Sequence, residues 1–245
     1  MIEAHGLGVK RNGGFVVRGI DLALRPGQLT VVIGPNGAGK SSLLKCLAGE
    51  WRADEGAVSL HGAPLASYTA RQLAMRRAVM WQSGDAAPGL TVLELVALGR
   101  TPFGDGRTRS GEQFVLDAIA QTGLEGLAAR TADTLSGGER QRADFARALC
   151  QIRGVEAPIL MLDEPTASLD LKHQYHVLRS AKAEAAKGAA VFAVLHDLAL
   201  VRRFADRVIA LKDGRLFAEG SAKAIVSDEL ISALFDLPHD LAVAV

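Results

Sequence analysis

The chain has 245 residues, of which 49% are hydrophobic, and its 28 lysines and arginines almost balance 27 acidic residues, for a net charge of +1. An apolar share this large excludes a disordered chain, and the balanced charge argues against nucleic acid or an anionic membrane as the main partner. The two cysteines, Cys46 and Cys150, have neither metal-ligand nor redox spacing, which indicates buried free thiols in a reducing compartment.

The first quarter of the chain predicts a hairpin followed by a strand, a loop and a helix. Strand-like residues flank the stretch 11–14, whose Asn-Gly pair accepts the positive φ that tight turns need. Leu29–Ile33 is a short β-branched run, typical of a buried parallel strand, and it leads directly into a glycine-rich loop. Beyond that loop a helix is indicated, with these residues on one face: Leu43, Leu44, Leu47 and Ala48.

Later apolar runs end abruptly in polar residues. The run 159–162 stops at Asp163 and Glu164, and the run 191–195 stops at His196. In an open parallel α/β sheet, ligands bind outside the carboxyl ends of the strands. We therefore expect the glycine loop, the acidic pair and the histidine to converge on one ligand.

The region between these strands has helical periodicity instead. From about Gln82 to Ala132 it reads as helical segments with loops, which we interpret as an inserted helical subdomain. Near the end of the chain, Lys212-Asp213-Gly214 separates two strand-like runs and predicts a second hairpin.

The glycine loop matches the P-loop pattern Gly34-x-x-x-x-Gly39-Lys40-Ser41 in full, between a predicted strand and a predicted helix. In this pattern glycines let the backbone wrap phosphates, and the helix N-terminus adds a favourable dipole. Lys40 can reach the β- and γ-phosphates, and the Ser41 hydroxyl can bind Mg²⁺. The sequence thus predicts a nucleoside triphosphate site.

The acidic pair suits the same site. Asp163 offers the oxygen ligand that Mg²⁺ prefers, and Glu164 can act as the general base that polarises the attacking water. Taken alone, an acidic pair at a strand end is often a helix N-cap. The preceding apolar run and the P-loop favour the catalytic interpretation.

With Leu135-Ser-Gly-Gly-Glu139 in view, the chain resembles the ATP-binding subunits of ABC transporters over nearly its whole length. By this resemblance Gln82 corresponds to the Q-loop glutamine and a ligand of Mg²⁺, Asp163 and Glu164 to Walker B, and His196 to the switch histidine. Residues similar to Walker A, which would bind ATP, are Gly34, Pro35, Asn36, Gly37, Ala38, Gly39, Lys40, Ser41 and Ser42. Residues similar to the signature and the D-loop, which would meet the ATP of a second copy, are Ser136, Gly137, Gly138, Glu139 and Asp170.

Two positions depart from the common family pattern. The signature ends in Glu139, where glutamine is commonest, and Arg11 stands where an aromatic ring usually stacks on adenine. A guanidinium can also stack on a π-face, or Phe15 could do so, and both alternatives stay open. His173 and His176 lie three residues apart on a predicted helix, where a solvated face is a better interpretation than a metal site.

The resemblance implies an α/β fold with a P-loop NTPase (RecA-like) core. Its sheet would be mainly parallel, with an N-terminal antiparallel β subdomain and an inserted helical subdomain. Within a single ABC ATPase domain, 1–245, we expect a nucleotide-binding core at 1–81 and 157–220. The helical subdomain with the signature would cover 82–156, and a short C-terminal helical tail would cover 221–245.

The resemblance also implies partners and a cargo. Because no signal-peptide pattern opens the chain and no apolar run approaches the roughly 20 residues that span a bilayer, we expect a protein without its own membrane anchor. A homodimer would dock on two copies of a separate permease at the cytoplasmic face of the bacterial inner membrane. A periplasmic substrate-binding protein would act through the permease, and no nucleic acid is expected.

Several stretches are most similar to ATPases of importers for iron chelates, hemin and cobalamin, among them 93–102, 169–174 and 195–200. The residues 151–157 and 78–82 favour hemin, with a ferric siderophore or cobalamin as the alternative. A soluble ATPase for iron–sulfur cluster assembly is an alternative of another class. A DNA-repair ATPase is disfavoured, because the segment between Ser41 and Leu135 has no sustained heptads. An exporter is disfavoured because exporters often fuse the membrane domain to the ATPase.

Overall fold

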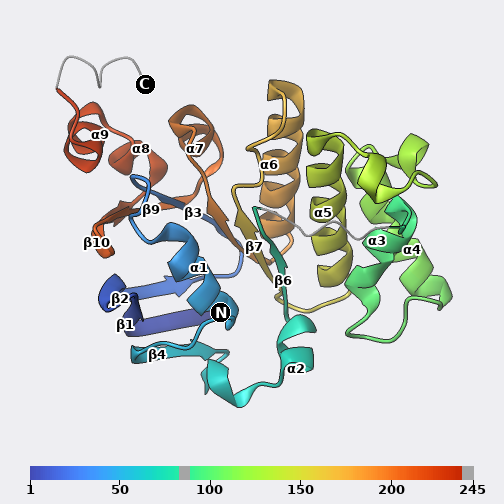
Figure 1. Ribbon diagram of the computed structural model, residues 1–245, viewed down its shortest axis with the longest axis horizontal. Coiled ribbons are helices and arrows are strands. Elements are labelled where there is room, and N and C mark those ends of the chain that lie inside the picture. Colours follow the sequence, from blue (N-terminus) through green and yellow to red (C-terminus); the bar gives the residue numbers. More distant parts are fainter. Residues whose placement is uncertain (83–88, 239–245) are drawn as a thin grey trace.

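The computed structural model describes residues 1–82 and 89–238, which form two sheets with helices packed between and around them (Figure 1). Among these residues, no helix combines the length and the apolar character that crossing a membrane requires. Cys46 and Cys150 are both buried and free, as the sequence predicts, and burial raises the pKa of each thiol to about 11.

The smaller sheet is antiparallel and holds the N-terminus. Its strands are β1 (Ile2–Arg11), β2 (Gly14–Leu24), β4 (Glu55–Leu60) and β5 (Ala63–Pro64), in the order β2-β1-β4-β5. The turn between β1 and β2 lies at Asn12 and Gly13, whose φ angles are 51° and 80°. The predicted first hairpin is therefore confirmed, with the positive φ values that favour Asn-Gly.

The larger sheet carries the predicted parallel strands. These are β3 (Leu29–Ile33), β6 (Arg77–Met80), β7 (Ile159–Asp163), β8 (Ala190–Val194), β9 (Arg207–Lys212) and β10 (Arg215–Gly220), in the order β10-β9-β3-β8-β7-β6. All neighbours pair in parallel except β10, which forms the second predicted hairpin with β9. Every residue of β3, β7 and β8 is buried, because both faces of the sheet are covered.

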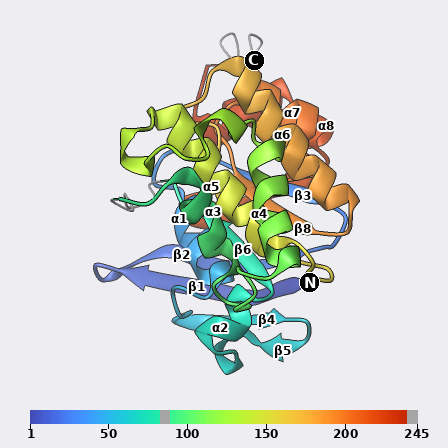
Figure 2. The same ribbon diagram turned by 90° about the vertical axis from the view of Figure 1, so that its right-hand side faces the viewer.

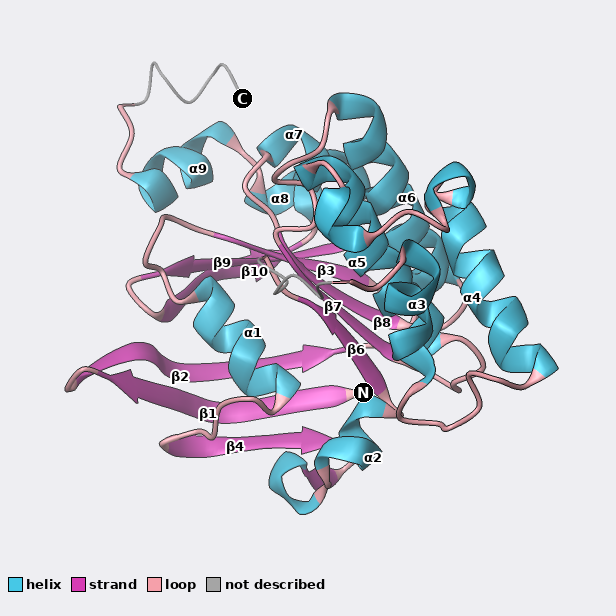
Figure 3. Cartoon of the chain, turned by 45° about the vertical axis from the view of Figure 1, so that its right-hand side comes forward, coloured by secondary structure: helices cyan, strands magenta, loops and turns pink. Residues whose placement is uncertain are grey.

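The two faces of the large sheet pack against different layers. On one face, alternate residues such as Val31 and Leu162 join a core formed with the larger helices. On the other, Val32 and Phe192 pack with α1 (Lys40–Ala48) and the antiparallel sheet. Figure 3 shows α1 between the two sheets. The start of α1 is thus held on both sides.

The remaining helices cover the large sheet and its ends. Figure 2 shows α3, α4, α5 and α6 side by side, and α5 also packs against β6 and β7. The α-helices not yet given are α2 (Ala70–Ala74), α3 (Val92–Ala97), α4 (Arg109–Gln121), α5 (Gly137–Ile152), α6 (Leu171–Ala186), α7 (Leu198–Phe204), α8 (Ala222–Ile225) and α9 (Asp228–Phe235). Single 3-10 turns are η1 (Leu65–Ser67), η2 (Leu98–Arg100), η3 (Glu125–Leu127) and η4 (Ala132–Thr134).

Candidate active site

The glycine loop joins β3 to α1 at a point where two other strands approach it. A Cβ atom on Gly34 would lie 2.1 Å from the Leu211 carbonyl oxygen, and one on Gly39 would lie 2.3 Å from that of Val16. Both glycines also have positive φ, 149° and 94°. Only glycine fits these positions without moving the neighbouring backbone, so the loop is fixed by its surroundings as well as by its own sequence.

The Lys40 side chain folds back over the loop. Its Nζ donates to the Gly34 carbonyl at 2.7 Å and to the Pro35 carbonyl at 2.8 Å. Burial lowers the pKa of Lys40, while the Glu164 and Asp163 carboxylates act in the opposite direction. A cation is therefore held at the centre of the loop, where an anion could replace the two carbonyl partners.

The hydroxyl of Ser41 faces the carboxylate that ends β7. Ser41 Oγ donates to Asp163 Oδ1 at 3.2 Å, and Asp163 is only 4% exposed. Burial is the main reason why the pKa of Asp163 is raised, although the hydrogen bond from Ser41 partly offsets it. A buried carboxylate beside a hydroxyl offers the hard oxygen ligands that Mg²⁺ prefers.

The carboxylate of Glu164 is held by residues from two neighbouring strand ends. Gln82 Nε2 donates to Glu164 Oε2 at 2.7 Å, and His196 Nε2 lies 2.7 Å from Glu164 Oε1. These three residues follow β6, β7 and β8, whose carboxyl ends meet at one edge of the parallel sheet. The backbone of Glu164 has φ 50°, a left-handed conformation that a non-glycine residue rarely adopts without a functional reason.

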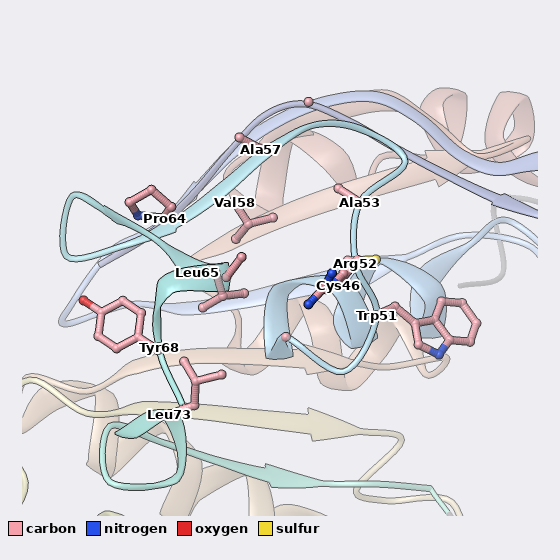
Figure 4. A pocket seen from close by; sticks show the side chains of 13 residues that line it. Cys46, Trp51, Arg52, Ala53, Ala57, Val58, Pro64, Leu65, Tyr68 and Leu73 are labelled. Carbon is pink, nitrogen blue, oxygen red and sulfur yellow. The ribbon is translucent and has the colours of Figure 1, made fainter. Parts of the chain in front are cut away.

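A cavity of about 290 Å³ lies over this arrangement. Its lining brings together the P-loop, the acidic residue and the histidine, and consists of Val16, Asn36, Gly37, Gly39, Lys40, Ser41, Ser42, Glu164 and His196. A larger cavity of about 450 Å³ lies between α1, β4 and α2 and shares no lining residue with it (Figure 4). Its labelled lining includes Cys46, Trp51, Leu65 and Tyr68, a mixture without convergent charges. The smaller cavity therefore contains the charged and polar residues that could bind and hydrolyse a phosphate ligand.

The signature stretch lies outside the lining of the phosphate cavity. Ser136 caps α5: its hydroxyl and its N–H both donate to Glu139 Oε2 at 2.8 Å, and Glu139 N donates back to Ser136 Oγ at 3.3 Å. These bonds lower the pKa of Glu139, the backbone one most. Ser136 and Gly137 are exposed and Gly138 is half-buried, so the start of α5 is open to a ligand from outside the chain on one side.

Asp170 is placed in a similar way at the start of α6. It accepts a hydrogen bond from His173 N at 2.9 Å, and His173 Nδ1 lies 2.8 Å from the same carboxylate oxygen. The backbone bond is the main cause of the lowered pKa of Asp170. In the described part of the chain, no group of three or more His, Cys, Asp or Glu side chains is arranged to hold a metal ion.

The two candidates for the adenine contact have other partners. The Arg11 guanidinium lies 3.9 Å from the centre of the Trp51 ring and donates to the Lys10 carbonyl at 2.6 Å. The Phe15 ring is covered by Lys10 at 4.6 Å and by Arg18 at 5.0 Å. Val16, which sequence reasoning did not single out, lines the cavity instead. The sequence pointed to Val16 only through its neighbour Phe15, which was a candidate for the adenine contact. Adenine contact by Arg11 stays a prediction.

Sequence reasoning also missed Gln141. This side chain is only 8% exposed, and it donates to the Glu164 carbonyl oxygen at 2.9 Å. The sequence offers only a weak signal: position 141 lies two residues after Glu139, on a helix otherwise described by its apolar face. The contact depends on how α5 packs against the end of β7.

A P-loop with a buried cation, followed by an acidic pair at a strand end, defines a nucleoside triphosphatase of the P-loop class. Residues 17–167 match the profile of the family described as "ABC transporter". The hemin import ATP-binding protein HmuV of Streptomyces coelicolor is 45% identical over 242 residues, covering 98% of this chain and 85% of the relative. HmuV of Gloeobacter violaceus is 45% identical over 243 residues, covering 97% and 88%.

A solved structure agrees with this assignment. The dimeric ATP-binding cassette MJ0796, in a post-hydrolysis state with ADP and Pi, has a TM-score of 0.78 at 26% identity. The match covers 91% of this chain and 99% of that one. The chain belongs to the ABC transporter family, as an ATP-binding subunit that hydrolyses ATP to drive transport.

Proposed function

We propose that this ATPase powers the import of hemin through a separate membrane permease. The observation that carries the hydrolytic part is the Glu164 carboxylate, held between Gln82 and His196 beside the P-loop cavity. The cargo is supported by the relatives, which are named for hemin import and are 45% identical over nearly the whole chain. A ferric siderophore or cobalamin is the alternative cargo.

The residues at the cavity fit ATP with Mg²⁺. The Ser41 hydroxyl and the Asp163 carboxylate would hold the ion, and the Gln82 amide would join them once it leaves Glu164. When bound, Mg²⁺ neutralises charge on the β- and γ-phosphates and fixes their orientation. The mixture of hydroxyl, carboxylate and amide oxygens is the ligand chemistry that this ion prefers.

The chain's own residues then act in turn. Lys40 exchanges the Gly34 and Pro35 carbonyls for phosphate oxygens, which suits a buried cation better than neutral partners. Glu164 accepts a proton from the attacking water, and His196 contacts the γ-phosphate. Backbone N–H groups of the loop hold the remaining phosphate oxygens.

The signature completes the site from a second copy of the chain. Ser136 and Gly137 are exposed and Gly138 is half-buried at the start of a 16-residue helix, whose dipole favours an anion. Glu139 and Asp170 cap the helices that carry these contact regions. The dimeric state of MJ0796 supports an assembly of two copies. We place these copies head to tail, with ATP between the P-loop of one and the signature of the other.

Transport requires further subunits. We place the dimer at the cytoplasmic face of the bacterial inner membrane, on two copies of a permease that receives hemin from a periplasmic binding protein. In this arrangement ATP favours the closed dimer, and hydrolysis releases it. A soluble role in iron–sulfur cluster assembly is the alternative of another class, and it requires no permease.

The Glu164→Gln variant tests the ATPase dimer. Loss of the proton acceptor should slow hydrolysis by about 100-fold or more while ATP still binds, so a closed dimer accumulates. Size-exclusion chromatography with Mg-ATP measures the dimer, and a phosphate-release assay measures hydrolysis. Lys40→Ala is the matched control, because it should lose nucleotide binding and stay monomeric. A monomeric Glu164→Gln variant with wild-type turnover would contradict both assignments.

Reconstitution tests the cargo. The ATPase is assembled with the permease that co-purifies from mild-detergent extracts and with its binding protein, in vesicles that contain ATP. Hemin should accumulate in an ATP-dependent way, whereas a ferric siderophore and cobalamin should not, and Glu164→Gln should abolish accumulation. Uptake of a siderophore or cobalamin alone would replace hemin by that cargo. Failure to recover any polytopic membrane protein would favour the soluble alternative.

A further inference from the structure

Gln141 uses both ends of its buried amide to join three separate elements. On α5, it lies one turn after the signature; its Nε2 donates to the Glu164 carbonyl oxygen at 2.9 Å. Its Oε1 accepts a hydrogen bond from Ser168 N, in the turn before α6, at 3.0 Å. Because one partner is an acceptor and the other a donor, only one orientation of the amide satisfies both.

The surrounding backbone makes this connection short and tightly packed. A Cβ on Gly138 would lie 3.1 Å from the Ser168 carbonyl oxygen, so the start of α5 touches the same turn directly. The Glu164 carbonyl also accepts from Ala167 N at 3.3 Å, which closes the turn that Gln141 contacts. A displacement of the start of α5 must therefore be transmitted to this turn.

The backbone of Glu164 is the element that this displacement would move. Its φ of 50° is a conformation that surrounding contacts must maintain, and Gln141 provides one of them at the carbonyl. Rotation of this peptide reorients the carboxylate that Gln82 and His196 hold. A shift of about 1 Å in a proton acceptor is enough to change a rate on the order of 100-fold.

We propose that Gln141 is a positioning residue that couples the signature of each chain to its own Glu164. The inference rests on the proposed dimer, in which the phosphate that meets Ser136 belongs to the nucleotide held by the partner. Gln141 thus links the two ATP sites. When the nucleotide of the partner occupies the signature of one chain, Gln141 of that chain adjusts its Glu164, which acts on the ATP in its own P-loop. Hydrolysis is consequently cooperative, and the link runs through α5 within one chain.

The first test replaces Gln141 by Met, which has a similar size and no amide. The expected result is a fall in kcat of about tenfold to 100-fold, with ATP affinity within about twofold of wild type. The Hill coefficient for ATP should fall from about 2 toward 1. Gln174→Met is the matched control, because Gln174 Nε2 contacts the Thr166 carbonyl of the same turn from α6, at 3.3 Å. Wild-type kcat and cooperativity in Gln141→Met would overturn the proposal.

A second variant separates the two ends of the amide and protects the test against misfolding. Gln141→Glu keeps an acceptor for Ser168 N and loses the donor to the Glu164 carbonyl. A similar loss of kcat in this variant, with a melting temperature near wild type, assigns the effect to the Glu164 contact. A wild-type kcat in Gln141→Glu would overturn that assignment.

Mixed dimers test the direction of the link. Pairing Gln141→Met with a Glu164→Gln partner leaves one active Glu164, in the chain that lacks Gln141, and hydrolysis should be slow. Pairing a chain that carries both changes with a wild-type partner leaves the active Glu164 beside its own Gln141, and hydrolysis should be near half of wild type. The reverse order of rates would show that Gln141 acts on the partner and overturn the proposal. Absence of any ATP-dependent dimer of Glu164→Gln chains would instead overturn the proposed function.

Discussion

At the scale of single residues, the site holds one carboxylate where burial disfavours its charged form. Asp163 is 4% exposed, and its pKa is raised mainly because burial disfavours the charged form. The hydrogen bond from the Ser41 hydroxyl and the more distant Lys45 charge offset this only in part. A buried charge of this kind lowers the free energy of unfolding until a cation neutralises it, which is a cost at a binding site rather than a contribution to the fold.

Asp163→Asn should therefore stabilise the nucleotide-free protein and abolish hydrolysis. Because the folded-state pKa lies above the ordinary 3.8, the native state binds this proton more tightly than the unfolded chain does. The wild type thus gains stability as the pH falls from the raised folded-state pKa toward 3.8. Above the raised pKa, Asp163 is fully charged and its destabilising effect is complete. At pH 7.5 the melting temperature should rise by about 2–4 °C, which corresponds to roughly 1 kcal/mol in a domain of this size.

Scanning calorimetry between pH 4 and pH 8 measures this difference. It should shrink as the pH falls, since protonation removes the charge from the wild type. Asp117→Asn, on the exposed face of α4, is the control and should show no such trend. An equal or lower melting temperature for Asp163→Asn at pH 7.5 would show that Asp163 is not a destabilising charge.

At the scale of single elements, the segment between α3 and α4 is organised by one buried cation. Arg100 is 3% exposed and pairs with Asp105 at 2.7 Å. The same guanidinium donates to the Cys150 and Arg153 carbonyls at 3.0 Å, so it also ties this segment to the end of α5. The hydrogen bonds from Arg100 lower the pKa of Asp105.

Arg100→Met should destabilise the helical region, which comprises α3, α4 and α5, while leaving the P-loop intact. The Asp105 carboxylate is 31% exposed and can be solvated, so the main loss is the donor to the Cys150 and Arg153 carbonyls, which costs about 2 kcal/mol or more. Urea unfolding measures the loss, and hydrogen exchange should localise it to residues 99–121. Arg107→Met, on the exposed surface of the same segment, should change the unfolding free energy by less than about 0.5 kcal/mol. Equal effects of the two variants would contradict the role of Arg100.

The elements also show what the sequence can and cannot predict. Apolar runs such as Leu29–Ile33 predict the buried strands, because burial on both faces leaves a continuous pattern. The P-loop follows from fixed spacing within a few residues, and the strand ends place Glu164 beside His196. The contacts of Gln141 and the stacking of Arg11 on Trp51 depend on how distant segments pack, and no local pattern encodes them.

At the scale of the whole molecule, hydrogen bonds connect the helical region to α2 and to strand β6. Arg71 Nε, on α2, donates to the Pro102 carbonyl oxygen at 2.9 Å. At the end of α5, Gln151 Nε2 donates to the Ala74 and Arg77 carbonyls at 2.8 Å and 3.0 Å. Figure 1 shows α3 and α4 at the end of the molecule opposite β10. A rotation of the helical region against the core would have to break the Arg71 contact or pivot on it.

A cross-link at this boundary should slow the ATPase cycle. In an Arg71→Cys, Pro102→Cys variant treated with a short bismaleimide, the helical region is fixed to α2, and closure around ATP is hindered. We expect kcat to fall about tenfold or more while the affinity for ATP in the monomer stays within about twofold, since the P-loop is untouched. The matched control is His5→Cys with Asp21→Cys, an exposed pair 3.9 Å apart within the antiparallel sheet. Cross-linking this control pair should leave kcat unchanged, and a cross-linked 71–102 variant with wild-type kcat would show that the helical region works without moving against the core.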